Sequence, residues 1–130
     1  MKTSIKTFPH KHTGIRRLIF AFYYSMKGLM AGLRYEAAFR QEFLLFAAVI
    51  PIVFLLDFTV TERLALIGSV LAVMVVELVN SAIECTLDRV SIEMHPLAGR
   101  AKDYGSLAVL ITLMFAIAVW ASLILPKLIN

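Results

Sequence analysis

Three long runs of apolar residues divide the chain, at 43–56, 64–76 and 107–125. A helix needs about 20 residues to span the hydrocarbon core of a bilayer. Only the third run approaches that length alone. The first reaches it if its helix begins near Glu36, and the second if its helix continues to Leu87. The pattern therefore predicts an all-α membrane protein with transmembrane helices at about 36–56, 64–87 and 105–126.

A different pattern precedes the first run. Between Ile15 and Leu33 apolar residues recur at spacings of three and four, with basic residues largely on the other faces, which predicts an amphipathic helix over 14–35. Such a helix lies along the membrane surface, with its apolar side in the lipid. A cleaved signal peptide is the competing interpretation, but Arg34 and Arg40 and the absence of a long apolar core argue against it. Residues 1–13 show no periodicity and are expected to form a flexible tail.

Composition and charge fit a small membrane protein with a defined orientation. Of its 130 residues 60% are hydrophobic, and the net charge is +4. Eight of the 13 Lys and Arg lie in the first 40 residues, and Arg89, Arg100 and Lys102 cluster in the polar connector before the last span. By the positive-inside rule the N-terminus and this connector are cytoplasmic. The basic charge thus indicates orientation in a bilayer rather than binding to nucleic acid.

The segment 76–88, VELVNSAIECTLD, places polar residues directly after a run without charge. On a helix, Glu77, Asn80, Glu84 and Asp88 lie along one stripe. The rise per residue separates Glu77 from Glu84 by about 10 Å, so the two are expected to have different tasks. Because an ionisable group near hydrocarbon is destabilising, the deeper Glu77 needs a partner or a function. Asp88 is expected to be an interfacial group at the helix end.

Two further polar clusters have the chemistry to act with this stripe. One is RYEAAFRQE at 34–42, whose charges could equally balance each other among the headgroups, and the other is EMHPLAGRAKDYGS at 93–106. Carboxylates suit a hard cation such as magnesium, while Arg and Lys hold phosphate. Metal, phosphate-binding cations and a proton-accepting carboxylate are the parts that phosphoryl transfer needs.

Several other kinds of site have no motif in the chain. There is no GxxxxGK[ST] and no GxGxxG, which excludes a P-loop and a protein-kinase fold. Three histidines and one cysteine give no zinc spacing, and Cys85 cannot form an internal disulfide. No GxSxG appears, so a hydrolase of that type is unsupported.

The three clusters together resemble the prokaryotic diacylglycerol kinase family, through ELVNSAIExxLD at 77–88, EAAFRQE at 36–42 and GRAKDxGS at 99–106. The resemblance extends from about Arg17 to the last span; Met26 and Leu87 depart from it but remain apolar. It implies a homotrimer, each subunit having a surface helix and three transmembrane helices, with active sites at subunit contacts. It implies ATP-dependent phosphorylation of diacylglycerol to phosphatidic acid, with magnesium, at the cytoplasmic face of a bacterial inner membrane.

The resemblance also implies a role for each matching residue. Glu77 would be the general base, Glu36 and Glu84 would bind the magnesium carried with ATP, and Asn80 would help to fix this cluster. The ATP site would comprise Arg17, Tyr24, Glu36, Glu84, Glu93, Met94, His95, Lys102 and Asp103. The lipid site would comprise Arg17, Arg40, Glu42, Glu77 and Ser106.

Other assignments remain open at this stage. Undecaprenol kinase is the alternative within the same enzyme class, although EAAFRQE resembles the diacylglycerol type more closely. A small transporter or scaffold whose buried acids relay protons is a third possibility. His95 is expected to contribute its backbone more than its ring. Trp120 is expected to face the bilayer or its interface.

Overall fold

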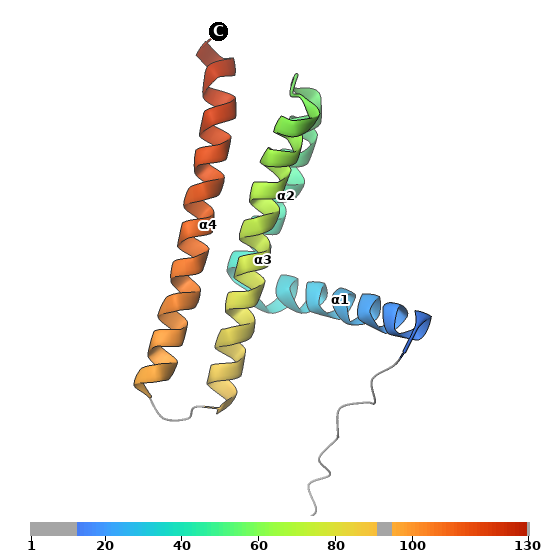
Figure 1. Cartoon of the computed structure of the whole chain (residues 1–130), viewed down its shortest axis with the longest axis vertical. Coiled ribbons are helices and arrows are strands. Elements are labelled where there is room, and N and C mark those ends of the chain that lie inside the picture. Colours follow the sequence, from blue (N-terminus) through green and yellow to red (C-terminus); the bar gives the residue numbers. More distant parts are fainter. Residues whose placement is uncertain (1–12, 91–94, 130) are drawn as a thin grey trace, which may run out of the picture. The chain divides into compact units, whose positions relative to one another are not determined.

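The computed structural model describes residues 13–90 and 95–129. The described chain forms four helices (Figure 1), which are α1 (Ile15–Tyr35), α2 (Ala37–Leu55), α3 (Val60–Val90) and α4 (Pro96–Ile129). By length and composition α2, α3 and α4 are each able to cross a membrane. The prediction of an all-helical, multi-pass membrane protein is therefore confirmed.

The chain divides after Ala31 into two compact units, each of which is described by itself. The first contains most of α1, which begins at Ile15 within the range predicted for an amphipathic helix. Large apolar side chains on it are exposed, among them Leu18 and Phe22 at 70% and 68%. The Lys27 ammonium lies 5.2 Å from the centre of the Tyr23 ring. These features suit a helix that meets a lipid surface.

In the second unit α3 packs against both α2 and α4. Val53, Phe58 and Leu66 form a buried apolar cluster near one end of these helices. Gly32, Phe39 and Leu78 make a second close contact, because a Cβ at Gly32 would lie 2.8 Å from the Phe39 ring and 3.2 Å from Leu78. Glycine at this position therefore lets the chain before α2 approach both side chains.

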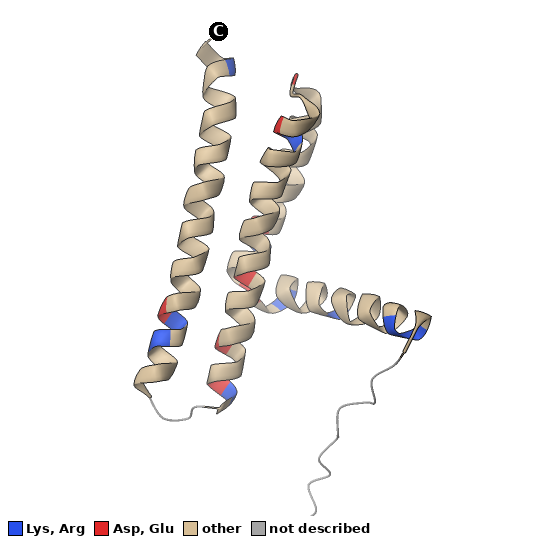
Figure 2. Cartoon of the chain, in the orientation of Figure 1, with Lys and Arg blue, Asp and Glu red and all other residues tan. Residues whose placement is uncertain are grey.

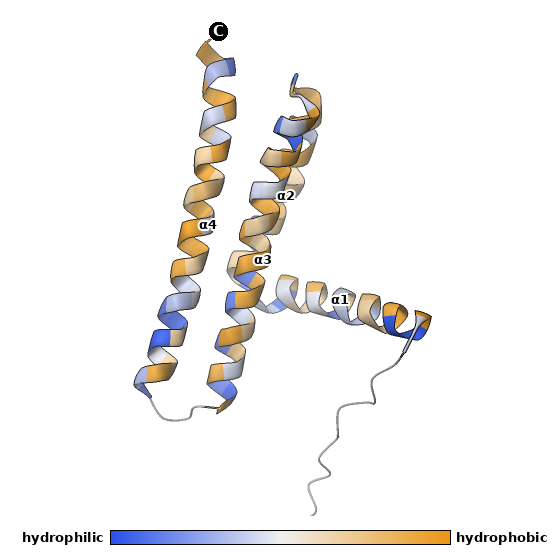
Figure 3. Ribbon diagram, in the orientation of Figure 1, coloured by the Kyte–Doolittle hydropathy of each residue, from blue (hydrophilic) through white to orange (hydrophobic). Residues whose placement is uncertain are grey.

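Charged residues are absent from long stretches of these helices (Figure 2). On α3 none occurs between Leu64 and Val76, and on α4 none occurs between Tyr104 and Pro126. The same stretches are predominantly hydrophobic in Figure 3. The uncharged stretches fit a bilayer core, and the charged ends fit its two interfaces.

The start of α3 is fixed by a capping box. The Thr59 hydroxyl accepts a hydrogen bond from the Glu62 backbone N–H at 3.3 Å, and the Glu62 carboxylate accepts from the Thr59 N–H at 2.7 Å. This reciprocal pair satisfies N–H groups that the first helical turn leaves unpaired. The helix can thus begin at Val60, before the apolar run at 64.

Helix α4 begins at Pro96, nine residues before the predicted position 105. Proline is favoured at the first helical position, where its missing N–H costs nothing. The His95 ring accepts a hydrogen bond at Nδ1 from the Leu97 N–H at 3.2 Å, which caps the helix. The His95 ring therefore has a structural contact that the sequence interpretation did not expect, and the cluster at 99–106 is helical.

The opposite end of the unit is closed by contacts from the end of α4. The Lys127 ammonium donates a hydrogen bond to the Asp57 carbonyl oxygen and lies 4.8 Å from the centre of the Phe58 ring. Helix α2 continues without interruption through Pro51. The end of α4 is therefore held beside the start of α3.

Candidate active site

The polar stripe on α3 runs from a buried to an exposed position. Glu77 is only 9% exposed, Asn80 and Glu84 are half-buried, and the Asp88 side chain is 67% exposed. The Asn80 side-chain nitrogen donates a hydrogen bond to Glu84 Oε1 at 3.2 Å. The stripe thus combines a deep carboxylate with a shallower one that an amide orients.

Further carboxylates converge on Glu77. Its carboxylate is close enough to Glu84 and Glu36 to interact electrostatically with both, and Glu42 is close enough to interact with Glu77. Glu36 precedes the first residue of α2 without making a side-chain cap hydrogen bond. Glu36 and Glu84, which the resemblance assigned to the same site as Glu77, are thus each close enough to Glu77 to interact with it.

Within residues 13–90 and 95–129 no cation forms an ion pair with Glu36, Glu77 or Glu84, because the only ion pair found there joins Lys102 to Asp88. Like charges in a poorly hydrated site repel one another, so a bound cation or a proton stabilises them. Magnesium takes oxygen ligands and is often held by one or two carboxylates together with substrate phosphates. In the same ranges no three metal-ligating side chains lie together. Carboxylate oxygens such as those of Glu36 and Glu84 have the chemistry to share magnesium with the phosphates of a nucleotide.

Lys102 links α4 to the exposed end of the stripe. Its ammonium lies 2.7 Å from Asp88 Oδ1, and it is close enough to interact with Glu84. Asp88 is thus more than an interfacial group at a helix end, since it forms an ion pair across two helices. Asp103 and Ser106, the next candidates on α4, are exposed.

The Arg40 guanidinium makes local contacts with the end of α1. Its Nη1 donates to the carbonyl oxygens of Leu33 and Arg34, each at 3.2 Å. Basic side chains commonly satisfy the last carbonyl groups of a helix in this way. The described contacts of Arg40 thus fix the chain before α2.

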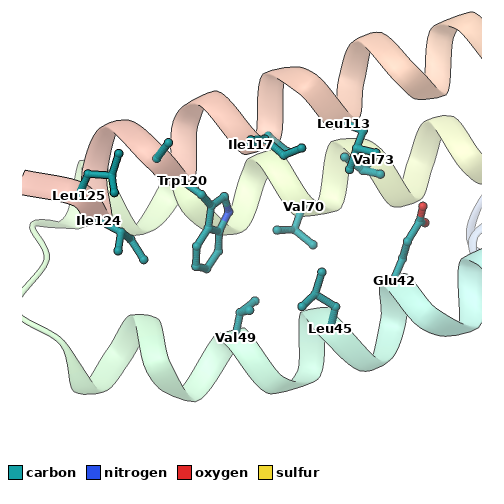
Figure 4. A pocket seen from close by; sticks show the side chains of 12 residues that line it. Glu42, Leu45, Val49, Val70, Val73, Leu113, Ile117, Trp120, Ile124 and Leu125 are labelled. Carbon is teal, nitrogen blue, oxygen red and sulfur yellow. The ribbon is translucent and has the colours of Figure 1, made fainter. Parts of the chain in front are cut away.

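An apolar groove of about 460 Å³ lies between α2, α3 and α4 (Figure 4). It is lined by Glu42, Leu45, Val49, Val70, Val73, Leu113, Ala116, Ile117, Trp120, Ala121, Ile124 and Leu125. Among the described residues Glu42 is the only charged one in the lining; it lies toward one end, and its buried Oε2 has no hydrogen-bond partner in that part of the chain. The volume falls in the range of about 300–1,000 Å³ that small-molecule pockets occupy.

Trp120 was expected to face the bilayer or its interface; in the structure its indole lines this groove and packs against the cluster of Val53, Phe58 and Leu66. Its Nε1 is buried and has no hydrogen-bond partner among the described residues. Helical spacing offered a signal, since Leu113, Ile117, Trp120 and Ile124 share one face of α4. Because α4 is apolar on almost all of its faces, the sequence alone does not show which face packs against the other helices.

The remaining candidates have less structural context. Arg17 and Tyr24 are exposed on α1, in the first unit. Glu93 and Met94 lie outside the described residues, as does the predicted tail up to residue 12.

Comparison with known proteins decides the family. The model of the prokaryotic diacylglycerol kinase family matches residues 23–124, which include the stripe and both flanking clusters. The chain belongs to the prokaryotic diacylglycerol kinase family. The predicted family and enzyme class, a lipid kinase, are thereby confirmed.

Relatives match over most of their own length. The diacylglycerol kinase of Pseudomonas aeruginosa is 48% identical over 113 residues, which cover 87% of this chain and 92% of the relative. That of Escherichia coli K12 is 48% identical over 112 residues, covering 86% and 92%. That of Haemophilus influenzae is 44% identical over 115 residues, covering 88% and 98%. The chain thus spans nearly the whole of each.

Proposed function

We propose that the protein transfers the γ-phosphoryl group of ATP to the free hydroxyl of diacylglycerol, which gives phosphatidic acid and ADP. Diacylglycerol kinase activity is the activity of the family to which the chain belongs. The observation that supports the site most directly is the buried Glu77 at the inner end of a carboxylate stripe. A base for a lipid hydroxyl has to lie where that hydroxyl lies, near the hydrocarbon boundary.

Glu77 is proposed to accept the proton of the lipid hydroxyl. In the described chain no side chain donates a hydrogen bond to its carboxylate, so both oxygens are available to a substrate. As the hydroxyl oxygen bonds to the γ-phosphorus, the bond from phosphorus to the β–γ bridging oxygen breaks and ADP leaves. The proton passes to Glu77, which acts as a general base. A direct, in-line transfer needs no phosphorylated enzyme.

Glu36 and Glu84 are proposed to hold magnesium. Bound magnesium supplies charge neutralisation at the phosphates of ATP. The Asn80 hydrogen bond keeps the Glu84 carboxylate in one orientation. The remaining ATP contacts are assigned to Arg17, Tyr24, Glu93, Met94, His95, Lys102 and Asp103.

We further propose that the active protein is a homotrimer in a bacterial inner membrane, with its N-terminus in the cytoplasm. Large apolar side chains are exposed along α4, and the buried polar atoms Glu42 Oε2 and Trp120 Nε1 lack partners in the described chain. Association would cover the exposed side chains and could bring hydrogen-bond partners to the polar atoms, which hydrocarbon would leave unsatisfied. The number three follows from the family resemblance, and the orientation from the distribution of Lys and Arg.

The apolar groove is proposed to hold part of the lipid substrate, with Glu42 and Ser106 near its polar end and Arg40 fixing the chain beside it. Trp120→Ala should then raise the KM for diacylglycerol by about tenfold, because an aromatic side chain in a pocket contributes on the order of 1–3 kcal/mol. The KM for ATP should stay unchanged. Trp120→Phe keeps a ring in the groove and should restore most of the lipid affinity in a mixed-micelle assay. An equal effect on both substrates would contradict this assignment.

Replacing Lys102 and replacing Asp88 should have different effects on the KM for ATP. Their ion pair is exposed and therefore weak, whereas the phosphates of ATP form stronger charge-assisted contacts. Lys102→Met is expected to raise the KM for ATP by about tenfold or more, and Asp88→Asn to change it by less than about threefold. Steady-state kinetics at saturating lipid measure both values. A larger effect of Asp88→Asn would show that the pair, and not the lysine alone, positions ATP.

The activity is tested by offering purified protein two lipids in the same detergent. With γ-labelled ATP and magnesium, label should appear in phosphatidic acid when dioleoylglycerol is present. Little label should appear in undecaprenyl phosphate when undecaprenol replaces it, and none in either lipid when a chelator removes magnesium. Preferential labelling of undecaprenol would assign the protein to the alternative lipid. No labelling of either lipid would favour a transporter or scaffold.

A further inference from the structure

Helices α3 and α4 approach each other very closely at Gly105. Gly105 is buried, and a Cβ added there would collide with the side-chain oxygen of Asn80 and lie 3.2 Å from its Cγ. Both atoms belong to the amide of Asn80, whose nitrogen is hydrogen-bonded to Glu84, so the amide cannot turn away without losing that bond. Any residue other than glycine would displace either Asn80 or α4.

The amide of Asn80 has only one favourable orientation. Its Nδ2 donates to Glu84 Oε1 at 3.2 Å. An ionised carboxylate only accepts hydrogen bonds, so the nitrogen must face Glu84 and the oxygen must face Gly105. There Oδ1 is buried and has no hydrogen-bond partner among the described residues. It lies too close to the position of a Gly105 Cβ for such an atom to fit.

We propose that Gly105 is a positioning residue for phosphoryl transfer. Because Gly105 has no side chain, it leaves the space that the Asn80 oxygen occupies. The Asn80 nitrogen can then keep its hydrogen bond to Glu84. This hydrogen bond orients the Glu84 carboxylate for binding a divalent cation. The inference rests on the proposed function in assigning Glu84 to the metal. The contact between Gly105 and Asn80 does not depend on that assignment.

Two other helical glycines of the second unit have no such close contact. A Cβ at Gly68 on α3 or at Gly99 on α4 would meet nothing within 4 Å. Alanine also forms helices better than glycine. Gly68→Ala and Gly99→Ala therefore introduce the same chemical change as Gly105→Ala, without its clash, and are matched controls.

The first measurement is metal affinity, read without turnover. Mn²⁺ is titrated into each protein with a non-hydrolysable ATP analogue, and free Mn²⁺ is followed by electron paramagnetic resonance. Gly105→Ala should raise the dissociation constant by about tenfold, as the loss of a group that orients a metal ligand does. Gly68→Ala and Gly99→Ala should stay within about twofold of wild type. An unchanged affinity in Gly105→Ala would overturn the proposal.

A double-mutant cycle separates action through Asn80 from a general packing effect. Asn80→Ala removes both the clash and the hydrogen bond, so adding Gly105→Ala to it should change the Mn²⁺ affinity by less than about twofold. The unfolding midpoint should behave likewise. It should fall in Gly105→Ala relative to wild type, and adding Gly105→Ala to Asn80→Ala should hardly lower it further. If Gly105→Ala alone does not fold, the double variant should fold. Equal losses in both backgrounds, or a double variant that also fails to fold, would overturn the proposal.

The two readouts also distinguish this proposal from the proposed function. If wild-type protein bound no Mn²⁺ with the nucleotide analogue, the metal assignment of Glu84 would be wrong. Coupling in the unfolding midpoints would still uphold the placement of Asn80 by Gly105, and absence of that coupling would refute it.

Discussion

Replacing Glu77 with glutamine is expected to lower kcat by about 10²- to 10⁴-fold, the usual contribution of a general base. Glutamine keeps the size of the side chain and its capacity for hydrogen bonds, but it cannot accept the proton of the lipid hydroxyl. The affinity for ATP should therefore stay within about threefold of wild type. Single-turnover kinetics with saturating lipid, together with equilibrium binding of a nucleotide analogue, measure the two effects separately.

Glu62→Gln is the matched control for this variant. Glu62 lies on the same helix, at its other end, where its carboxylate accepts hydrogen bonds from Thr59. Glutamine also serves in a capping box, so the fold should be retained and kcat should change by less than about twofold. Full turnover in Glu77→Gln would remove Glu77 from the role of base. An equal loss in both variants would indicate damage to α3 and not to the chemistry.

Replacing Glu84 or Glu36 with glutamine is expected to raise the free magnesium concentration for half-maximal rate by at least about 100-fold. Removing a group that only orients a metal ligand typically lowers the metal affinity by about 10- to 100-fold. Removing a ligand should lower it at least as much. In Glu84→Gln the new amide oxygen can still accept the hydrogen bond from Asn80, so the change removes charge more than shape. The measurement is the rate against free magnesium at saturating ATP and lipid.

Glu42→Gln is a control that distinguishes the loss of any negative charge near Glu77 from the loss of a metal ligand. Glu42 also lies near Glu77, but it lines the apolar groove and is assigned to the lipid. Its replacement should leave the magnesium dependence unchanged within about twofold while altering the KM for diacylglycerol. If Glu42→Gln shifted the magnesium dependence as much as Glu84→Gln, the metal would have to be reassigned within the carboxylate group.

The graded depth of the stripe on α3 could be predicted from the sequence. Helical spacing alone places Glu77, Asn80, Glu84 and Asp88 on one face, and the preceding apolar run places Glu77 deepest. The structure agrees, with Glu77 buried and Asp88 exposed. Periodicity and hydropathy are local properties, so one helix reveals them without knowledge of its neighbours.

Helix α4 begins nine residues before the membrane span predicted at 105–126, because hydropathy does not define helix ends. Pro96 and the His95 ring begin the helix among polar residues, ahead of the apolar run. Capping depends on hydrogen bonds at a few positions, which an average over an apolar segment does not detect. The cluster 99–106 is accordingly held on a helix beside α3, rather than in a loop.

Contacts between helices could not be predicted from the spacing of residues. The convergence of Glu36 on Glu77, the position of Trp120 in the groove and the contact of Gly105 with Asn80 each depend on how two helices cross. Crossing angle and register arise from packing along the whole interface. For Glu36 and Glu77 the family resemblance supplied what spacing could not.

The most direct test of the proposed site is a crystal structure of the protein with Mn²⁺ and a non-hydrolysable ATP analogue. Anomalous scattering locates the metal independently of the protein density. We expect an anomalous peak in contact with the carboxylates of Glu36 and Glu84, and a γ-phosphate that faces Glu77. A metal held by other residues, with Glu77 remote from the γ-phosphate, would contradict it.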